Sequence, residues 1–90
     1  IRLLFRAGDH LMGSILPLGQ EKEITVEARG ELPFKAVEIY RNGELHKRFK
    51  PNSVEFLDSI LIDSSTPAYW YVRALQIDNE IAWSSPIWFE

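Results

Sequence analysis

The sequence predicts an all-β domain, and three observations predict it. Apolar and polar residues alternate with a period of two in short stretches, as in strands that bury one face. Turn-forming residues separate these stretches about every 8–12 residues. No stretch shows the 3.6-residue period of a helix over a helix's length. Residues 1–90 therefore fit one domain, an immunoglobulin/fibronectin III-like β-sandwich of seven or eight short, mainly antiparallel strands.

The first strand is predicted over residues 1–5, where apolar side chains occupy every second position. It ends at residues 8–10, because Gly8 and Asp9 readily adopt turn conformations. A second extended segment, residues 11–18, contains Pro17 and therefore suits the edge of a sheet. The chain begins inside a strand and without an initiator methionine, so we expect a fragment of a longer protein.

The next two strands lie on either side of a loop predicted at residues 29–33. Residues 24–28 place alternate apolar side chains on one face, which is typical of a half-buried strand. The strand that begins at Val37 runs into Asn42-Gly43, the strongest short-range signal for a β-hairpin. The return strand is therefore expected over residues 45–49.

Three further strands complete the prediction. In residues 54–62 apolar side chains fall on both faces, which leaves the register open and allows a bulge. In residues 69–75 the inward row is expected to be Trp70, Val72 and Ala74. A turn at Asp78-Asn79 leads into residues 81–89, where Pro86 indicates an edge or a bulge.

Composition excludes several classes of function. With 46% hydrophobic and 12% aromatic residues the chain is a folded protein. A net charge of −3 gives no electrostatic footprint for nucleic acid, and no apolar run is long enough to span a membrane. There is no cysteine, which excludes disulfides and thiolate metal sites and favours a cytoplasmic location.

No residue combination predicts catalysis or a cofactor. His10 and His46 are the only histidines, too few for the three or four converging ligands of a metal site. Residues 78–80 offer oxygen atoms, but a turn explains them. Ser84 and Ser85 lack a base and an oxyanion donor, so a strand edge shaped by Pro86 is expected there. The basic cluster at residues 46–50 is read as a solvated hairpin arm.

The aromatic side chains are the best candidates for an interaction surface. If Trp70 points inward, Tyr69 and Tyr71 must point outward. Exposed tyrosine and tryptophan are favoured at interfaces. The predicted surface consists of Tyr40, Tyr69, Tyr71, Leu75 and Trp88. The alternative is that neighbouring loops or residues 11–18 cover these side chains.

Three stretches together resemble a known protein family: Arg2-Leu3-Leu4-Phe5 leading to Met12-Gly13-Ser14, then Val37 to Gly43, then Tyr71-Val72-Arg73 followed by Ala82 to Trp88. In this order they resemble the C-terminal extension of bacterial proteins of the PHP superfamily, metal-dependent phosphoesterase-like hydrolases named after polymerase and histidinol phosphatase. The resemblance covers nearly the whole chain and implies a β-sandwich beside a catalytic barrel. The family's metal ligands begin with a His-x-His pair, which this chain lacks, so none of those ligands is transferred.

The sequence leaves three functional hypotheses. The first is a non-catalytic accessory domain that docks on the upstream catalytic domain or on a second subunit. The second is a carbohydrate-binding module that stacks sugars on exposed Trp or Tyr. The third, an autonomous enzyme, is disfavoured because the chain lacks a recognisable base, nucleophile and metal ligands.

Overall fold

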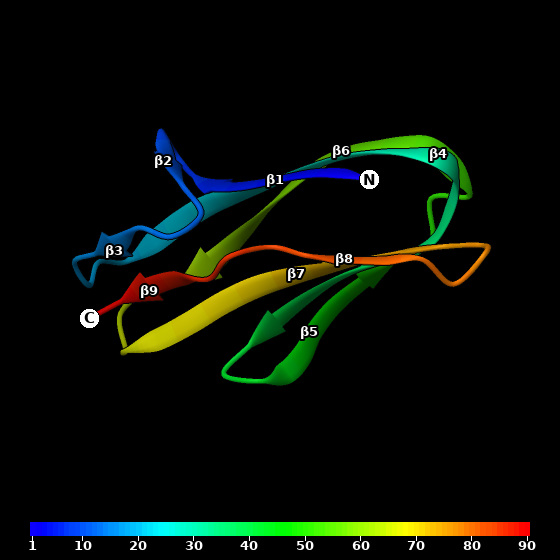
Figure 1. Ribbon diagram of the computed structural model, residues 1–90. Coiled ribbons are helices and arrows are strands. Elements are labelled where there is room, and N and C mark those ends of the chain that lie inside the picture. Colours follow the sequence, from blue (N-terminus) through cyan, green and yellow to red (C-terminus); the bar gives the residue numbers. More distant parts are fainter.

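The computed structural model describes residues 1–90 as nine β-strands without a helix (Figure 1). The strands are β1 (Arg2–Ala7), β2 (His10–Leu11), β3 (Ile15–Leu16), β4 (Glu21–Arg41), β5 (Glu44–Phe49), β6 (Ser53–Asp63), β7 (Ala68–Gln76), β8 (Ile81–Trp83) and β9 (Ile87–Phe89). All pairs are antiparallel except β3 with β9. The all-β class is confirmed, with nine strands in place of seven or eight.

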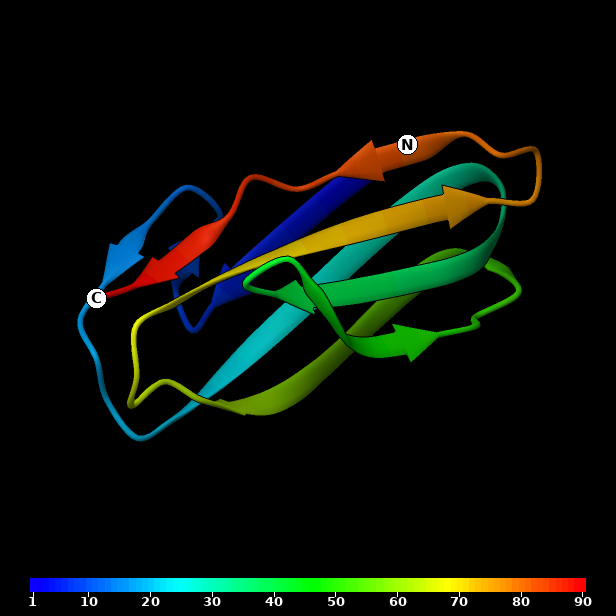
Figure 2. The same cartoon turned by 90° about the horizontal axis from the view of Figure 1, so that it is seen from below.

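Strand β4 organises the molecule because its two halves pair with different neighbours. The first half lies between β1 and β6, and the second half lies between β5 and β7. The register shifts between Arg29 and Phe34, and there the strand bends so that the sheet curls over itself (Figures 1 and 2). The curled sheet thus has one arm of β2, β1, β4 and β6, and a second arm of β5, β4, β7, β8, β9 and β3.

The loop predicted at residues 29–33 is wrong, because the chain remains extended through this bend. The reason lies in long-range hydrogen bonds that local turn residues do not reveal. The side-chain oxygen of Gln76 accepts the N–H groups of Glu31 and Leu32, at 3.1 and 3.5 Å. The carbonyl oxygen of Pro33 accepts the N–H of Ile77, at 3.0 Å.

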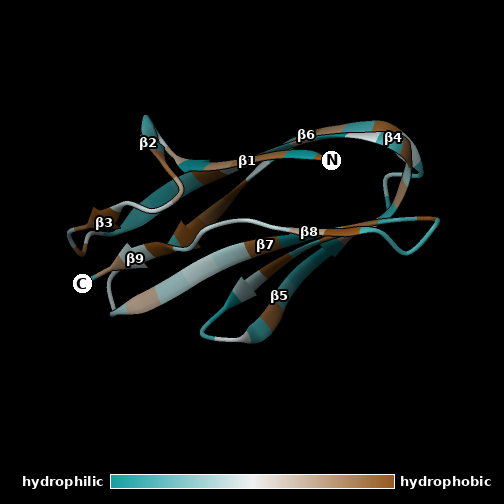
Figure 3. Cartoon of the chain, in the orientation of Figure 1, coloured by the Kyte–Doolittle hydropathy of each residue, from teal (hydrophilic) through white to brown (hydrophobic).

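The hydrophobic core lies between the two arms. Apolar and polar residues alternate along the strands (Figure 3), and the apolar rows of β1, β4, β7 and β9 meet in a single cluster. The predicted inward row of Trp70, Val72 and Ala74 is confirmed, since all three side chains are buried. This row fixes the opposite row of β7 on the outer surface, because successive side chains of a strand point to opposite faces.

The hairpin predicted at Asn42-Gly43 is confirmed and joins β4 to β5. Asn42 and Gly43 both have positive φ, 52° and 84°, as a two-residue Asn-Gly hairpin turn requires. The carbonyl oxygen of the Asn42 side chain also accepts the N–H of Tyr69, at 3.0 Å. This bond ties the hairpin to the start of β7.

Two terminal segments differ from the prediction. The extended segment expected over residues 11–18 contains only the last residue of β2 and the two residues of β3. The strand expected over residues 81–89 is divided into β8 and β9 by Ser84, Ser85 and Pro86. Ser84 replaces the missing ladder bonds: its hydroxyl accepts the N–H of Val72 at 2.8 Å, and its own N–H donates to the carbonyl of Val72 at 2.9 Å.

Candidate functional site

Aromatic side chains converge on the outer face of the second arm. The outward row of β7 contains Tyr69, Tyr71, Arg73 and Leu75, half-buried in each case. The register then places Trp88 of β9 opposite Tyr69, Tyr40 of β4 opposite Tyr71, and Trp83 of β8 opposite Arg73. We call the group of Tyr40, Tyr69, Tyr71, Trp83 and Trp88 the aromatic face.

The rings of the aromatic face form one continuous series of contacts. Tyr40 and Tyr71 are stacked, with ring centroids 5.1 Å apart and planes 7° apart. Tyr69 lies 6.1 Å from Tyr71 and 5.1 Å from Trp88, and Trp83 lies 6.0 Å from Tyr71. The tyrosines are half-buried, whereas Trp83 is 58% and Trp88 39% exposed. The face therefore presents two indole rings held by a row of packed tyrosines.

A buried carboxylate lies beside the aromatic face and orients its polar groups. Glu38 of β4 is buried, and its two carboxylate oxygens accept hydrogen bonds from the Nε atoms of Arg48 and Arg73, both at 2.7 Å. The hydroxyl of Tyr40 donates a third bond to this carboxylate, at 3.1 Å. The guanidinium of Arg73 also lies 5.7 Å above the ring of Trp83, so the carboxylate positions Trp83 through Arg73.

The electrostatics of this cluster follow from its geometry. Burial raises the pKa of Glu38, but the hydrogen bonds from Arg48, Tyr40 and Arg73, together with the charge of Arg73, outweigh burial and hold the pKa below its ordinary value. The pKa of Tyr40 is raised by burial and by its hydrogen bond to the carboxylate. Glu38 is therefore an ionised partner for the two arginines at neutral pH.

Most of the surface predicted from the sequence does come together. Tyr40, Tyr69, Tyr71 and Trp88 all belong to the aromatic face. Leu75 lies on the same side of β7 but farther along it, opposite Ile81 of β8. Trp83 is missing from the prediction, because its pairing with Arg73 requires the turn to be centred on Asp78, whereas a turn centred between Asp78 and Asn79 would place Ser84 opposite Arg73.

The other sequence candidates do not form a common site. His10 and His46 lie on separate strands, β2 and β5, and no group of three or more His, Cys, Asp or Glu side chains is placed to hold a metal ion. The Asp78 carboxylate accepts bonds from the side chain of Gln76 and the N–H of Glu80, both at 3.1 Å. These bonds lower the pKa of Asp78 and close its turn.

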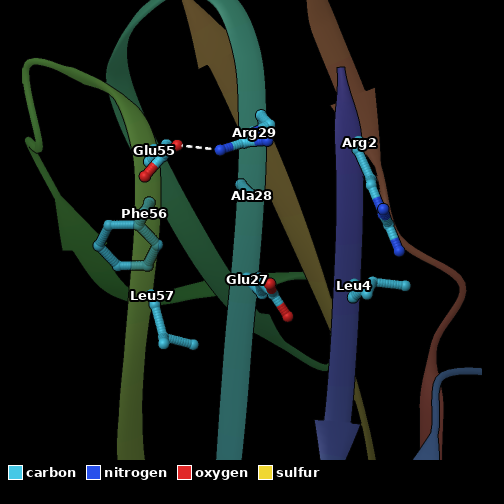
Figure 4. Close-up of a pocket in the computed structure, with 8 residues that line it drawn as sticks. All are labelled: Arg2, Leu4, Glu27, Ala28, Arg29, Glu55, Phe56 and Leu57. Atoms are coloured by element: carbon cyan, nitrogen blue, oxygen red, sulfur yellow. Dashed lines mark hydrogen bonds and ion pairs between the residues drawn. The ribbon is translucent and has the colours of Figure 1, made fainter.

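A second surface feature is a hollow on the first arm (Figure 4). Its polar lining is two arginines and two glutamates, Arg2, Arg29, Glu27 and Glu55, and Arg29 forms an ion pair with Glu55 across β4 and β6. Opposite charges therefore balance in the hollow, which gives it no net attraction for a charged ligand. No helix that could cross a membrane is present.

The sequence is similar to part of a longer bacterial protein. No protein-family model matches the sequence, and no solved structure matches it. An uncharacterized protein of Chlamydia pneumoniae is 34% identical to this chain over 109 residues, in an alignment that includes all of the chain. The chain spans only 18% of that relative's length, so a sequence similar to this one forms a small part of a longer protein there.

Proposed function

We propose that this chain is a non-catalytic accessory domain of a longer protein and that its aromatic face docks on the upstream catalytic domain of that protein. The observation that carries the proposal is the continuous aromatic face with two exposed indole rings. Tyrosine and tryptophan combine large apolar area with low conformational entropy loss and are enriched at protein interfaces. The similarity to a small part of a long bacterial protein supports the placement within a larger chain.

The fold we propose for this domain is the immunoglobulin/fibronectin III-like sandwich. The pairing pattern supports it, because β1, β4 and β6 form one layer while β5, β4, β7 and β8 form the other. The bend of β4 carries the chain from one layer to the next, and the core lies between them. Such domains commonly act as spacers and docking units on which function resides in surface patches.

The partner to test first is a metal-dependent hydrolase domain of the PHP superfamily, because that is the neighbour implied by the sequence resemblance. The polar groups beside the indole rings suit such an interface. Arg73 and Arg48 remain partly exposed while bound to Glu38, so they can donate further hydrogen bonds to a docked surface. A hot spot with aromatic anchors and arginine at its edge is typical of specific interfaces.

The test compares the solvent accessibility of the exposed tryptophans in two forms of the protein. Acrylamide quenching of tryptophan fluorescence is measured on the 90-residue chain and on the full-length source protein. In each protein either Trp83 or Trp88 is kept as the single tryptophan, and all other tryptophans are replaced by phenylalanine. We expect strong quenching in the isolated domain and weak quenching in the full-length protein. Equal quenching in both forms would refute docking through the aromatic face.

A binding measurement with matched variants completes this test. The isolated domain is titrated with the separately expressed remainder of the protein, and Trp83→Ala with Trp88→Ala should weaken binding by about tenfold or more. Leu11→Ala is the control, because Leu11 is a comparably exposed apolar residue, 57% exposed, on β2. Binding that resists the double substitution would contradict the proposal.

A second candidate, carbohydrate binding, is favoured by one observation: Trp83 and Trp88 are both exposed on the same face. Sugars stack their apolar faces on flat exposed indole rings. A glycan array with the isolated domain tests this alternative. A binder whose affinity is lost in Trp88→Ala would establish it, whereas the absence of any binder would remove it.

A further inference from the structure

Strand β6 presents a long unpaired edge. It has 11 residues and hydrogen-bonds only to β4, on one side; Figure 2 shows it at the margin of its arm. The strand contains neither proline nor glycine, and its ladder with β4 is regular from Glu21↔Asp63 to Arg29↔Glu55. Its open side therefore offers a continuous row of outward-pointing backbone groups.

Two side-chain hydrogen bonds show which residues of β6 point to the open side. The N–H of Glu55 donates to the hydroxyl of Ser53 at 3.2 Å, and the N–H of Ser59 donates to the carboxylate of Asp58 at 2.8 Å. Because backbone groups alternate along a strand, the N–H and C=O groups of Leu57 and Leu61 point the same way. The side chains of these two leucines are 66% and 64% exposed.

Two other edges of the sheet are better protected against pairing than β6 is. Strand β5 is six residues long, carries three consecutive basic residues at 46–48, and faces a bulge in β4 between Ile39 and Tyr40. The edge formed by β3, β8 and β9 consists of pieces of two or three residues next to Pro17 and Pro86. Short strands, charges, bulges and prolines all oppose edge pairing.

We propose that β6 is a self-association edge, at which two copies of this chain pair antiparallel about a two-fold axis at Ser59. The occupant must be an extended strand, because only a strand satisfies the row of open backbone groups. A two-fold dimer requires the surface to complement itself, and β6 does so in this register. Leu57 of each copy then lies opposite Leu61 of the other copy, on the same face of the sheet. The two exposed leucines of β6 in each copy are thereby covered.

The register follows from the alternation of backbone groups. The residues whose backbone points outward are 55, 57, 59 and 61, so each must face another odd-numbered residue to form hydrogen-bonded pairs. Shifting the axis by one residue, to Asp58, would place Leu57 opposite Ser59 and Leu61 opposite Glu55. Only the axis at Ser59 pairs both leucines of one copy with leucines of the other. Each Glu55 would lie opposite Asp63, with Arg29 neutralising Glu55.

Asp58 keeps this association weak. Its carboxylate occupies the N–H of Ser59, which is the donor that lies at the two-fold axis of the proposed dimer. The second copy must displace this carboxylate before the central pair of hydrogen bonds can form. A charged residue that guards an open edge is a common protection against uncontrolled pairing.

A cysteine cross-link tests the register directly, since the chain has no cysteine of its own. The Cα atoms of a hydrogen-bonded antiparallel pair lie about 5.5 Å apart, within the range of a disulfide. Ser59→Cys should therefore form a covalent dimer under mild oxidation. Ser53→Cys is the matched control, because in this register the two copies of residue 53 lie at opposite ends of the paired strands.

Sedimentation equilibrium on the cysteine-free chain measures the association itself. We expect a reversible dimer, a dissociation constant raised about tenfold or more by Leu57→Lys, and a tighter dimer with Asp58→Ala. Leu11→Lys, at another exposed leucine, 57% exposed and on β2, should leave the dimer unchanged. A monomer at millimolar concentration, equal cross-linking of the two cysteine variants, or a dimer that tolerates Leu57→Lys would each overturn the proposal. Because β6 is remote from the aromatic face, failure of the docking proposal leaves this one standing.

Discussion

The side-chain amide of Gln76 lies against Gly30, in the space that a Cβ atom at residue 30 would need. Gln76 is buried at the end of β7, and its oxygen accepts two backbone N–H groups from the bend of β4. Its amide nitrogen donates to Asp78 in the following turn. This one side chain therefore joins the bend of β4 to the turn between β7 and β8, and it can do so only beside a glycine.

The first prediction concerns that contact. Gly30→Ala should lower the free energy of unfolding by about 2 kcal/mol, because the new methyl group displaces the Gln76 amide and crowds Phe34. Urea denaturation followed by circular dichroism measures the change. Gly19→Ala is the control, since a Cβ there meets only the Ser64 hydroxyl at an ordinary 3.4 Å. Equal stability of the two variants would contradict the packing described.

The bend of β4 is also a part of the fold that the local sequence pattern did not predict. Local pattern was sufficient for the inward row of β7 and for the Asn42-Gly43 hairpin, because period and turn chemistry decide both. It was insufficient at residues 29–33, where Gly30 and Pro33 indicate a loop but Gln76, more than 40 positions later, satisfies the backbone of an extended chain. Long-range partners of this kind leave no periodic signal.

The aromatic face could be predicted only in part, because some of its residues depend on strand pairing. Alternation placed Tyr69 and Tyr71 outward, which the register with β4 and β9 extends to Tyr40 and Trp88. Trp83 depended on the pairing of β8 with β7, which requires the exact end of the preceding turn. The burial of Glu38 was not foreseen, because arginines from two other strands, Arg48 and Arg73, enclose it.

A second prediction follows from the lowered pKa of Glu38. A carboxyl group whose pKa is lower in the folded state stabilises the fold above its unfolded pKa of about 4.3, and this stabilisation disappears as the pH falls through the folded-state pKa. Glu38→Gln should therefore cost about 2 kcal/mol at pH 7 and flatten the decline of stability below pH ~4.3. The variant should still lose some stability as the pH falls, because the pKa values of Asp63 and Asp78 are also lowered.

Urea denaturation of both proteins from pH 7 down to pH 3 or so measures this effect. The two stability curves should converge as the pH falls, because protonation removes from the native protein the charge that the substitution has already removed. Parallel curves would show that Glu38 does not contribute through its ionised form. Arg48→Lys is a useful comparison, since it keeps the charge beside Glu38 but loses the directed Nε–H bond.

A third prediction separates the central ring of the aromatic face from its exposed rim. Tyr71 contacts Tyr40, Tyr69 and Trp83, so Tyr71→Ala should destabilise the fold by about 2 kcal/mol. Trp83→Ala removes a ring that is more than half exposed and should cost about 1 kcal/mol or less. Thermal unfolding of both variants checks the order, and a larger loss for Trp83→Ala would contradict it.

The final prediction concerns Trp70, which is buried in the core while its indole Nε1 has no hydrogen-bond partner. Its ring is instead held by apolar neighbours and by His46, whose ring meets it edge-on at 4.8 Å between centroids. A buried donor without a partner costs about 1–3 kcal/mol, which is close to the packing energy that a change from indole to phenyl removes. Trp70→Phe should therefore alter the free energy of unfolding by about 1 kcal/mol or less.

Trp70→Ala provides the comparison, because it removes the same unpaired donor but leaves a large cavity. It should lower the free energy of unfolding by about 3–5 kcal/mol. Urea denaturation followed by circular dichroism gives both values without relying on tryptophan fluorescence. If Trp70→Phe proves nearly as costly as Trp70→Ala, the indole N–H must make a favourable interaction that both substitutions remove, which would contradict an unpaired donor. A near-neutral Trp70→Phe would mean that the indole at this position serves the core by its volume alone.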